Sequence, residues 1–230
     1  MMNKHDQIKA FVKEELEIFG GPLYMPETVL ETDMEKTSVS SDVKTLSEFN
    51  NVIENCMNCP LGATRTNFVF GAGNPDADVM FVGEAPGEKE DLEGLPFVGR
   101  SGKLLTDILK AIDLTRDDVY IANILKCRPP KNRDPNKAEI EECEPYLLKQ
   151  IEMIKPKLLV ALGRISATTL LRTKDSLTSM RGQVFDYHGT DMVVTYHPAA
   201  LLRNPNWKRP AWEDFKKIRE MYLEKRGEQA

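Results

Sequence analysis

Short apolar runs alternate with amphipathic stretches along most of this chain, and this alternation limits the possible folds more than any other feature. Uninterrupted apolar residues predict buried strands at residues 78–83, 118–123 and 157–163. Apolar side chains at helical spacing predict helices at residues 101–113 and 136–154. Strands that alternate with helices favour a parallel sheet covered on both faces. We therefore expect an α/β fold, a three-layer α/β/α sandwich around a mostly parallel central sheet.

The flanking segments are predicted in the same way. Short helices are expected at residues 46–55 and 164–172, and Pro145 predicts a kink in the helix that contains it. QVFDY and DMVVTY flank a His-Gly pair and predict a hairpin. The segment ALLRNPNW is expected to form a loop. A closing helix at residues 210–226 is expected to turn four side chains inward: Trp212, Phe215, Ile218 and Tyr222.

The N-terminal part differs from the rest of the chain. Residues 6–19 have helical spacing, and the GGP sequence at residues 20–22 ends that helix. The residues that follow carry few large apolar side chains, which is typical of a linker. We therefore expect an N-terminal extension at residues 1–40, a helix plus a loose linker, and one larger domain at residues 41–230.

The composition is that of a soluble globular protein, with 41% hydrophobic and 29% charged residues among 230. No apolar run approaches the roughly 18 residues that span a bilayer. The first residues are charged throughout and contain no apolar centre of a secretory signal. We therefore expect a cytoplasmic protein without membrane contact.

Positive charge is concentrated in two places, although the net charge is −5. Lys and Arg supply most of the affinity for phosphates, so their local distribution matters more than the sum. One group lies within twelve residues that include a single acid, Asp134: Lys126, Arg128, Lys131, Arg133 and Lys137. A second group includes no acid: Arg203, Lys208 and Arg209. An ordinary solvated surface is the alternative for both groups.

An acidic loop containing Gly and Pro follows the first strand of the predicted core. It reads GEAPGEKEDLEGLPFVG (83–99), and five of its 17 residues are acidic. A phosphate-binding loop would avoid that much negative charge. Ligands of open α/β sheets bind beyond the carboxyl ends of the strands, where Asn123 and His197 also stand. We expect a pocket there, with the acidic loop as one wall.

Three familiar motifs are incomplete. GAGNPD (71–76) lacks the sixth small residue and the following helix of a dinucleotide-binding loop, and GLPFVGRS (94–101) has Arg100 where a phosphate-binding loop needs lysine. The His-x-Glu sequence of zinc nucleobase deaminases is absent. None of these three classes is favoured.

The chain has four cysteines, spaced C-x2-C, then 67 residues, then C-x15-C: Cys56, Cys59, Cys127 and Cys143. Cytosolic chains seldom keep disulfides, which favours metal binding or catalysis. Four thiolates suit zinc and an iron–sulfur cluster equally well. Four unrelated buried cysteines are the alternative, because only one pair is close in sequence.

Several blocks of the sequence together resemble the family 4 uracil-DNA glycosylases, the iron–sulfur type common in prokaryotes. Their agreement in order and spacing is far more specific than any single block, and residues 1–40 lie outside it. The blocks are CMNCPLGATRT (56–66), FGAGNPDADVMFVGEAPGEKED (70–91), GLPFVGRSGKLL (94–105), NILKCRPPKNRDP (123–135), Cys143, ALG (161–163) and HPAALLR (197–203).

The resemblance implies an enzyme that hydrolyses the N-glycosidic bond of uracil in single- or double-stranded DNA. Free uracil is released and an abasic site is left, as the first step of base excision repair. The resemblance also implies a structural 4Fe-4S cluster on Cys56, Cys59, Cys127 and Cys143. We expect a monomer, and a monofunctional enzyme because no lysine is placed as a Schiff-base nucleophile. A related branch that binds uracil sites covalently through a histidine is disfavoured, because no histidine lies between residues 6 and 187.

The resemblance assigns roles to the pocket residues. Phe97 would stack on the uracil ring, and Asn123 would donate to O4 and accept the N3–H. Cytosine presents the reverse pattern and would be rejected. His197 would hydrogen-bond O2, where negative charge grows as the bond breaks. Glu84 and Glu90 are the candidate carboxylates for the attacking water.

The resemblance does not assign the water-activating carboxylate to a single residue. Family 1 enzymes have a catalytic aspartate where this chain has Ala85, which we place in the substrate site. The carboxylate must then come from elsewhere, or the leaving group must carry more of the barrier. We expect Glu84 to hold uracil or water and Glu90 to help place the water, with Asn132 also facing the substrate.

DNA contacts are expected on two segments. Arg128 or Lys131 would meet the DNA backbone. Leu201 or Leu202 would wedge into the stack that the extruded base leaves, and Arg203 would bind a phosphate. Core packing is the alternative for the two leucines.

Two other functions compete with uracil excision. One is a metal-cluster-containing DNA- or nucleotide-binding module without turnover, which the joint presence of Glu84, Phe97, Asn123 and His197 argues against. The other is a zinc-stapled hydrolase of free nucleosides, which the basic groups and the HPAALLR segment argue against.

Overall fold

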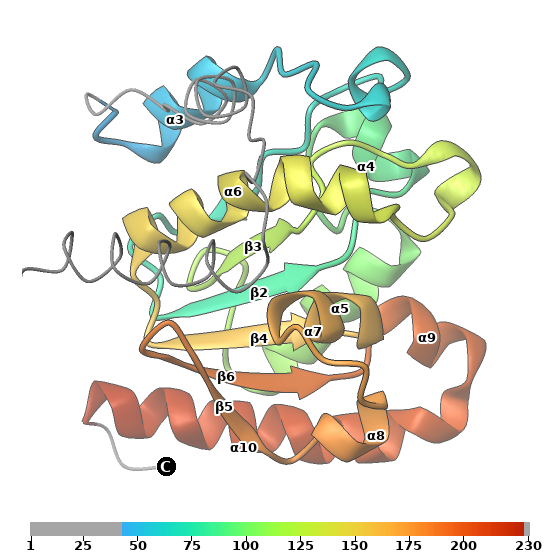
Figure 1. The fold of residues 1–230 in the computed structure, drawn as a ribbon. Helices are drawn as coiled ribbons and strands as arrows, with labels where there is room; N and C mark the ends of the chain where they lie inside the picture. Colours follow the sequence, from blue (N-terminus) through green and yellow to red (C-terminus); the bar gives the residue numbers. More distant parts are fainter. Residues whose placement is uncertain (1–42, 228–230) are drawn as a thin grey trace, which may run out of the picture. The chain divides into compact units, whose positions relative to one another are not determined.

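The computed structural model describes residues 43–227, within the unit Asp42–Ala230 (Figure 1). The predicted helix at residues 6–19 and its linker lie outside the described residues. A six-stranded sheet has the order β1-β3-β2-β4-β6-β5, parallel in its four central strands and antiparallel at both edges. The strands are β1 (Ala72–Gly73), β2 (Val79–Gly83), β3 (Tyr120–Asn123), β4 (Leu158–Leu162), β5 (Val184–Tyr187) and β6 (Thr190–Thr195). The predicted α/β fold is confirmed.

Helices connect the strands. The α-helices are α3 (Leu46–Ile53), α4 (Glu88–Glu93), α5 (Arg100–Ala111), α6 (Lys137–Ile154), α7 (Arg164–Leu170), α8 (Leu177–Met180), α9 (Pro198–Arg203) and α10 (Lys208–Arg226). Three short 3-10 turns are η1 (Pro60–Ala63), η2 (Pro130–Asn132) and η3 (Pro205–Trp207). None of the described helices combines the length and apolarity needed to cross a bilayer.

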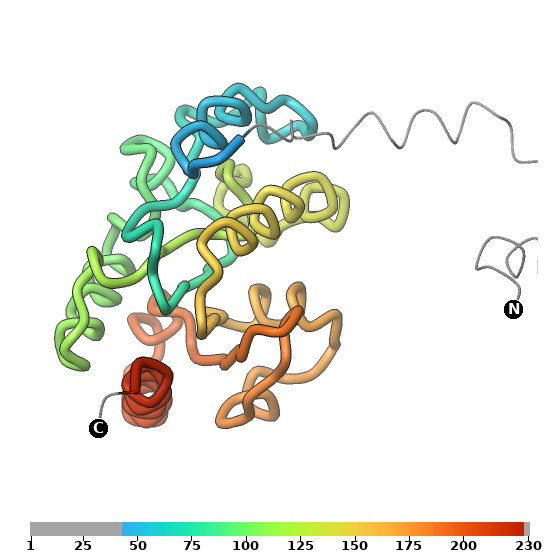
Figure 2. The backbone as a smooth tube through the Cα atoms, turned by 90° about the vertical axis from the view of Figure 1, so that its left-hand side faces the viewer, coloured from blue at the N-terminus to red at the C-terminus, as the bar shows by residue number. Residues whose placement is uncertain are grey.

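Two apolar layers cover the sheet because its central strands are apolar on both faces. On one face, strand residues such as Val82 pack with Leu147 of α6 and Ala167 of α7. On the other face, Phe81 packs with Leu109 of α5 and Phe215 of α10. Figure 2 shows α5 and α10 on one side of the strands and α6 and α7 on the other.

The connections leave the sheet in opposite directions at its centre. The chain leaves β2 toward α5 on one face, whereas it leaves the neighbouring strand β4 toward α7 on the other. Such a switch point opens a crevice at the carboxyl ends of the strands. The ends of β2 and β3 lie side by side there, with Gly83 opposite Asn123 in the parallel register.

Three local predictions need correction. The segment predicted as a loop begins inside α9, which starts with Pro198 and whose first turn is capped by His197. Trp212 was expected inside, but it is 38% exposed and Ala211 takes the inward position. The acidic loop contains a short helix, α4. Pro145 lies inside α6, and the kink expected there stays a prediction.

Candidate active site

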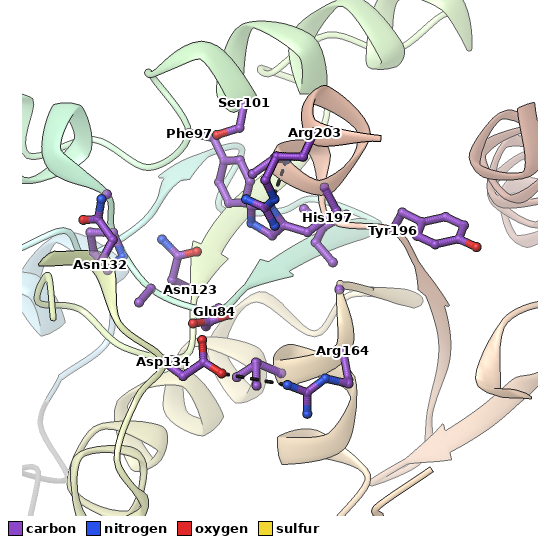
Figure 3. Close-up of a pocket in the computed structure, with 18 of the residues that line it drawn as sticks. Glu84, Phe97, Ser101, Asn123, Asn132, Asp134, Arg164, Tyr196, His197 and Arg203 are labelled. Atoms are coloured by element: carbon purple, nitrogen blue, oxygen red, sulfur yellow. Dashed lines mark hydrogen bonds and ion pairs between the residues drawn. The ribbon is translucent and has the colours of Figure 1, made fainter. Parts of the chain in front are cut away.

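A pocket of about 640 Å³ opens at the carboxyl edge of the sheet (Figure 3). Small-molecule sites typically measure about 300–1,000 Å³. Its walls come from the segments that follow β2, β3, β4 and β6. The structure brings these predicted residues together in its lining: Glu84, Ala85, Glu90, Phe97, Asn123, Asn132, His197 and Arg203.

Asn123 is buried at the end of β3. A Cβ atom on Gly83 would lie 2.3 Å from Asn123 Oδ1 and 2.7 Å from Phe97 Cζ, so glycine lets the amide and the ring meet. Within residues 43–227, Asn123 Oδ1 is the one buried side-chain polar atom without a hydrogen-bond partner. Leaving a buried acceptor unpaired costs about 1–3 kcal/mol. The amide is therefore built for a ligand that donates to it.

Phe97 is held in an unusual backbone conformation beside Asn123. Its φ of +53° lies in the left-handed region, which bulky residues rarely adopt. The guanidinium of Arg116 donates to the carbonyl oxygens of Pro96 and Phe97 at 2.7 and 3.1 Å. A Cβ on Gly102 would lie 1.8 Å from the Phe97 carbonyl oxygen, so only glycine fits beneath the turn. These contacts fix the ring at the pocket wall.

Glu90 supports the same turn from its other side. The carboxylate is buried, and its Oε1 accepts the N–H groups of Val98 and Gly99 at 3.0 and 2.9 Å. Glu90 also borders the pocket. Sequence reasoning expected it to help place a water. The observed hydrogen bonds add a role that sequence reasoning did not anticipate, the positioning of the loop that carries Phe97.

His197 presents a defined tautomer. Its Nδ1 accepts the Ala199 N–H at 3.1 Å, so the proton of the neutral ring is on Nε2. Burial and then Arg203 lower the pKa of the imidazole to about 4, which keeps it neutral near pH 7. The ring lies 5.4 Å from the Phe97 ring. The pocket thus contains a hydrogen-bond donor without a full positive charge.

Glu84 faces the pocket from the end of β2, close to Asp134 (Figure 3). Burial and the neighbouring Asp134 raise the pKa of Glu84 to about 7, while Arg164 and Arg203 act in the opposite sense. Asp134 Oδ2 lies 3.8 Å from Arg164 Nη2. A carboxyl group that titrates near neutral pH suits proton transfer. Sequence reasoning missed Asp134 at the site, although it is the single acid of the basic group.

The loop between β3 and α6 forms another wall. Lys131 and Asn132 both have left-handed φ values, +56° and +54°. Arg128 Nε donates to Asn132 Oδ1 at 2.8 Å, and its Nη1 lies 3.9 Å from Glu88 Oε1. Arg128 therefore orients Asn132 in this structure, whereas Lys131 is exposed to solvent.

α9 separates the two candidate wedge residues. Leu201 is 1% exposed and packs with Tyr196 and Ala211, so its expected DNA contact is corrected to a core position. Leu202 is 37% exposed and is the leucine that DNA can reach. Arg203 is exposed and lines the pocket.

The two basic groups differ in how much free positive charge they offer. Lys126 of the first group is completely buried, which corrects its expected place on a surface. Three more members have acidic partners: Arg128 with Glu88, Arg133 with Glu139, and Lys137 with Glu141. By contrast, Arg203, Lys208 and Arg209 are exposed and form no ion pair with any residue between 43 and 227. The second group is the more available for phosphates.

The four cysteines are free thiols that lie near one another. Cys127 is within electrostatic range of Cys56 and Cys59, and Cys143 is within range of Cys59 and Cys127. Burial raises the pKa of Cys143 to about 12, so a bound cation would be needed to keep it ionised. Across the described part of the chain, no three His, Cys, Asp or Glu side chains are grouped as a site for a single metal ion.

The surroundings of these thiols fit an anionic metal–thiolate centre. Three donors point at sulfur atoms: Lys126 N–H at Cys143, Arg65 at Cys127, and the Tyr146 hydroxyl at Cys56. The buried Lys126 ammonium bonds the neutral Asn123 carbonyl oxygen and Gln150 Oε1, at 2.8 and 2.6 Å, and has no acidic partner among residues 43–227. Buried charges are normally paired. Four thiolates on a cluster would supply the missing negative charge.

Comparisons with known proteins agree with this arrangement. Residues 70–216 match the model of the uracil DNA glycosylase superfamily. The chain is 50% identical over 187 residues to a type-4 uracil-DNA glycosylase of Sulfurisphaera tokodaii, covering 77% of this chain and 85% of that protein. The corresponding proteins of Archaeoglobus fulgidus and Thermotoga maritima are 44% and 45% identical, over 78% and 76% of this chain and 94% and 93% of theirs.

We predict that Glu84→Gln stabilises the protein progressively as the pH rises above about 4.5, with the full gain reached above pH 7. The folded pKa is raised from 4.5 to about 7, so the folded state holds the proton more tightly and the free energy of unfolding falls between these pH values. Glutamine avoids that loss. After allowance for solvent screening we expect a gain of about 1–2 kcal/mol at pH 8 and none at pH 4.

Urea denaturation at both pH values measures this difference. Glu88→Gln, which replaces an exposed carboxylate four residues along the chain, is the matched control and should change little at either pH. A Glu84→Gln protein no more stable than wild type at pH 8 would show that Glu84 ionises without cost.

Proposed function

The chain belongs to the uracil-DNA glycosylase superfamily, and we propose that it hydrolyses the N-glycosidic bond between uracil and deoxyribose in DNA. The reaction releases free uracil, leaves an abasic site and begins base excision repair. The structural observation that supports this proposal most strongly is the unpaired Asn123 Oδ1 in the pocket, next to the Phe97 ring and the neutral His197.

Base recognition is assigned to Asn123 and Phe97. Asn123 Oδ1 accepts the N3–H of uracil and its NH2 group donates to O4, which satisfies the unpaired oxygen. Cytosine would place an acceptor against Oδ1 and a donor against the NH2 group. Sites that depend on buried hydrogen bonds reject such analogues strongly, because the polar groups are left unpaired. The fixed ring of Phe97 stacks on the base.

Departure of uracil is assigned to His197. As the glycosidic bond breaks, negative charge accumulates on the base and positive charge on the sugar. The Nε2–H of neutral His197 donates to O2 of uracil, where it stabilises the leaving anion. A single positioned donor of this kind contributes about 10²–10³ in rate.

The attacking water is assigned to Glu84. Its pKa of about 7 leaves a fraction ionised at neutral pH, able to orient a water and to accept its proton as it adds to C1′. Glu90 borders the same space and holds the Phe97 loop. The resemblance puts Ala85 where family 1 enzymes have their aspartate, so the carboxylate must come from elsewhere, and Glu84 and Glu90 are the two carboxylates of the acidic loop that line the pocket.

DNA contacts are assigned to the pocket rim. Extruding a nucleotide costs a few kcal/mol of unstacking, which a side chain inserted into the stack offsets. The exposed Leu202 fills that role, with Arg203 beside it on a phosphate. Lys131, exposed next to Asn132, meets the DNA backbone, and Arg128 orients Asn132 for the substrate.

A 4Fe-4S cluster is assigned to Cys56, Cys59, Cys127 and Cys143. Hydrolysis of the glycosidic bond requires no electron transfer, so the bound cluster supplies a cross-link and negative charge. The cross-link ties the segment before β1 to the loop that leaves Asn123. Lys126 would connect that loop to the cluster, because its ammonium donates to the Asn123 carbonyl oxygen and its backbone N–H donates to the Cys143 sulfur.

The protein is proposed to act as a monomer on single- or double-stranded DNA in the cytoplasm. Among residues 43–227, no lysine lines the pocket, which supports a monofunctional glycosylase without lyase activity.

Incubation with an oligonucleotide containing one deoxyuridine tests the function. We expect strand cleavage at that site after alkali, in EDTA, and none with deoxycytidine or thymidine there. His197→Ala should lower kcat about 10²–10³-fold with little change in DNA affinity. An iron-replete, folded protein that leaves deoxyuridine intact would overturn the assignment.

Asn123→Asp tests base recognition. An aspartate accepts hydrogen bonds when ionised and can donate one when protonated, so we expect uracil excision to fall about 100-fold or more and the discrimination against cytosine to shrink. Excision from matched uracil and cytosine oligonucleotides measures both effects, with Asn51→Asp, an exposed residue of α3 outside the pocket, as the control. Intact uracil activity with cytosine still ignored would contradict the role of Asn123.

Cys127→Ala tests the cluster. We expect loss of iron and of visible absorbance together with a drop of about 3 kcal/mol or more in the free energy of unfolding, because metal binding and folding are coupled. Iron analysis, absorbance and urea denaturation measure these changes. Met57→Ala, an exposed neighbour of Cys56, is the control. A colourless variant as stable as wild type would show that the cluster does not support the fold.

A further inference from the structure

Trp207 is a large aromatic residue left exposed at the edge of the pocket. It is the last residue of η3, the short turn that follows α9. Trp207 lines the pocket and is nevertheless 40% exposed. Burying a ring of this size would favour folding by a few kcal/mol. None of the roles assigned to the uracil site belongs to Trp207, although its ring lies next to that site.

The ring is held in place by a stack of two further side chains. The Tyr196 ring lies 5.1 Å from the Trp207 ring at an interplanar angle of 17°. The Arg181 guanidinium lies 4.4 Å from the centre of the Tyr196 ring and donates to its hydroxyl at 3.2 Å. Because one face of Trp207 rests on Tyr196, the exposed area belongs to the remaining face and edges.

The bottom of this stack is anchored in the core. Arg181 donates to both carboxylate oxygens of Asp214, at 2.7 and 2.9 Å, and to the Pro210 carbonyl oxygen at 2.7 Å. Asp214 also accepts the Thr195 hydroxyl at 2.7 Å. An aromatic ring that is already ordered loses little conformational freedom when a ligand binds to it.

Free positive charge flanks Trp207 in the sequence. Arg203 lies four residues before Trp207, and Lys208 and Arg209 follow Trp207 directly. All three are exposed, and none has an ion-pair partner in the described part of the chain. An aromatic platform flanked by unpaired cations is how proteins bind single nucleic-acid strands, by stacking on a base and tracking its phosphates.

We propose that Trp207 is a stacking platform for the DNA base next to the extruded uridine, with the adjoining phosphates on Arg203, Lys208 and Arg209. This inference rests on the proposed function, since the extruded uridine must occupy the pocket whose edge Trp207 forms. The platform adds a second nucleotide-binding position in the same strand, independent of pairing with a complementary strand.

The two tryptophans of the chain allow a direct test. Trp212 is 38% exposed, nearly the same as Trp207, but it does not line the pocket. Trp212→Phe leaves Trp207 as the sole tryptophan, and Trp207→Phe leaves Trp212. Each variant is titrated with a single-stranded oligonucleotide that carries a tetrahydrofuran abasic analogue, which has no glycosidic bond to cleave. We expect strong quenching of Trp207 fluorescence and little change for Trp212.

Affinity and turnover provide the second measurement. Trp207→Ala should weaken binding of that oligonucleotide about 5- to 150-fold, the loss expected for one stacked base, and raise KM while changing kcat less than about threefold. Trp207→Phe should retain most of the affinity, and Trp212→Ala should match wild type. Equal quenching of both tryptophans, or an unchanged affinity in Trp207→Ala, would overturn the platform. A wild-type protein that fails to excise uracil would overturn the proposed function. Uracil excision by wild type, together with unchanged Trp207 fluorescence on titration of Trp212→Phe, would overturn this inference alone.

Discussion

Above Gly83, the amide of Asn123 and the ring of Phe97 come so close together that no side chain fits between them and the strand. The contact depends on the parallel register that places Gly83 opposite Asn123, and therefore on the whole central sheet. It also depends on the turn that carries Phe97, which Arg116 holds from one side and Glu90 from the other. The fold therefore fixes the Asn123 amide, which can hydrogen-bond the edge of a planar ligand, and the Phe97 ring, which can stack on its face, before the ligand binds.

The charges of the site differ between the groups that face the base and the groups at its exposed edge. Close to the base the groups are neutral or partly neutralised, since His197 is uncharged and Glu84 titrates near pH 7. Full positive charge stands on Arg203, which is exposed and lines the pocket, and on its neighbours along the chain. The Nε2–H of neutral His197 would interact more strongly with the anionic leaving base than with neutral uracil, and such a difference is what accelerates a reaction. In our proposal the exposed cations act on the DNA backbone.

Sequence reasoning predicted the sheet well because its central strands are apolar without interruption, a pattern that depends little on context. The strand ends then placed the pocket residues. It failed where a one-residue shift decides orientation. Adjacent positions on a helix point about 100° apart, so Leu201 and Leu202 could not be told apart while the segment was assigned as a loop. Similarly, helical spacing allows Ala211 or Trp212 inside, and hydrophobicity alone favoured the larger. Lys126 looked like surface charge because its acceptors are neutral groups that no charge pattern reveals, the Asn123 carbonyl three residues away and the Gln150 side chain of α6.

The left-handed backbone of Phe97 has a consequence for attempts to improve this protein. Holding a bulky residue there costs the fold about 1–2 kcal/mol, which glycine or asparagine would avoid. Burial of the ring outweighs that cost, because Phe97 is 5% exposed in the core cluster that contains Phe81 and Leu105, and truncating a buried phenylalanine costs about 3–5 kcal/mol. A library screened only for survival at high temperature would therefore keep a large apolar residue at position 97.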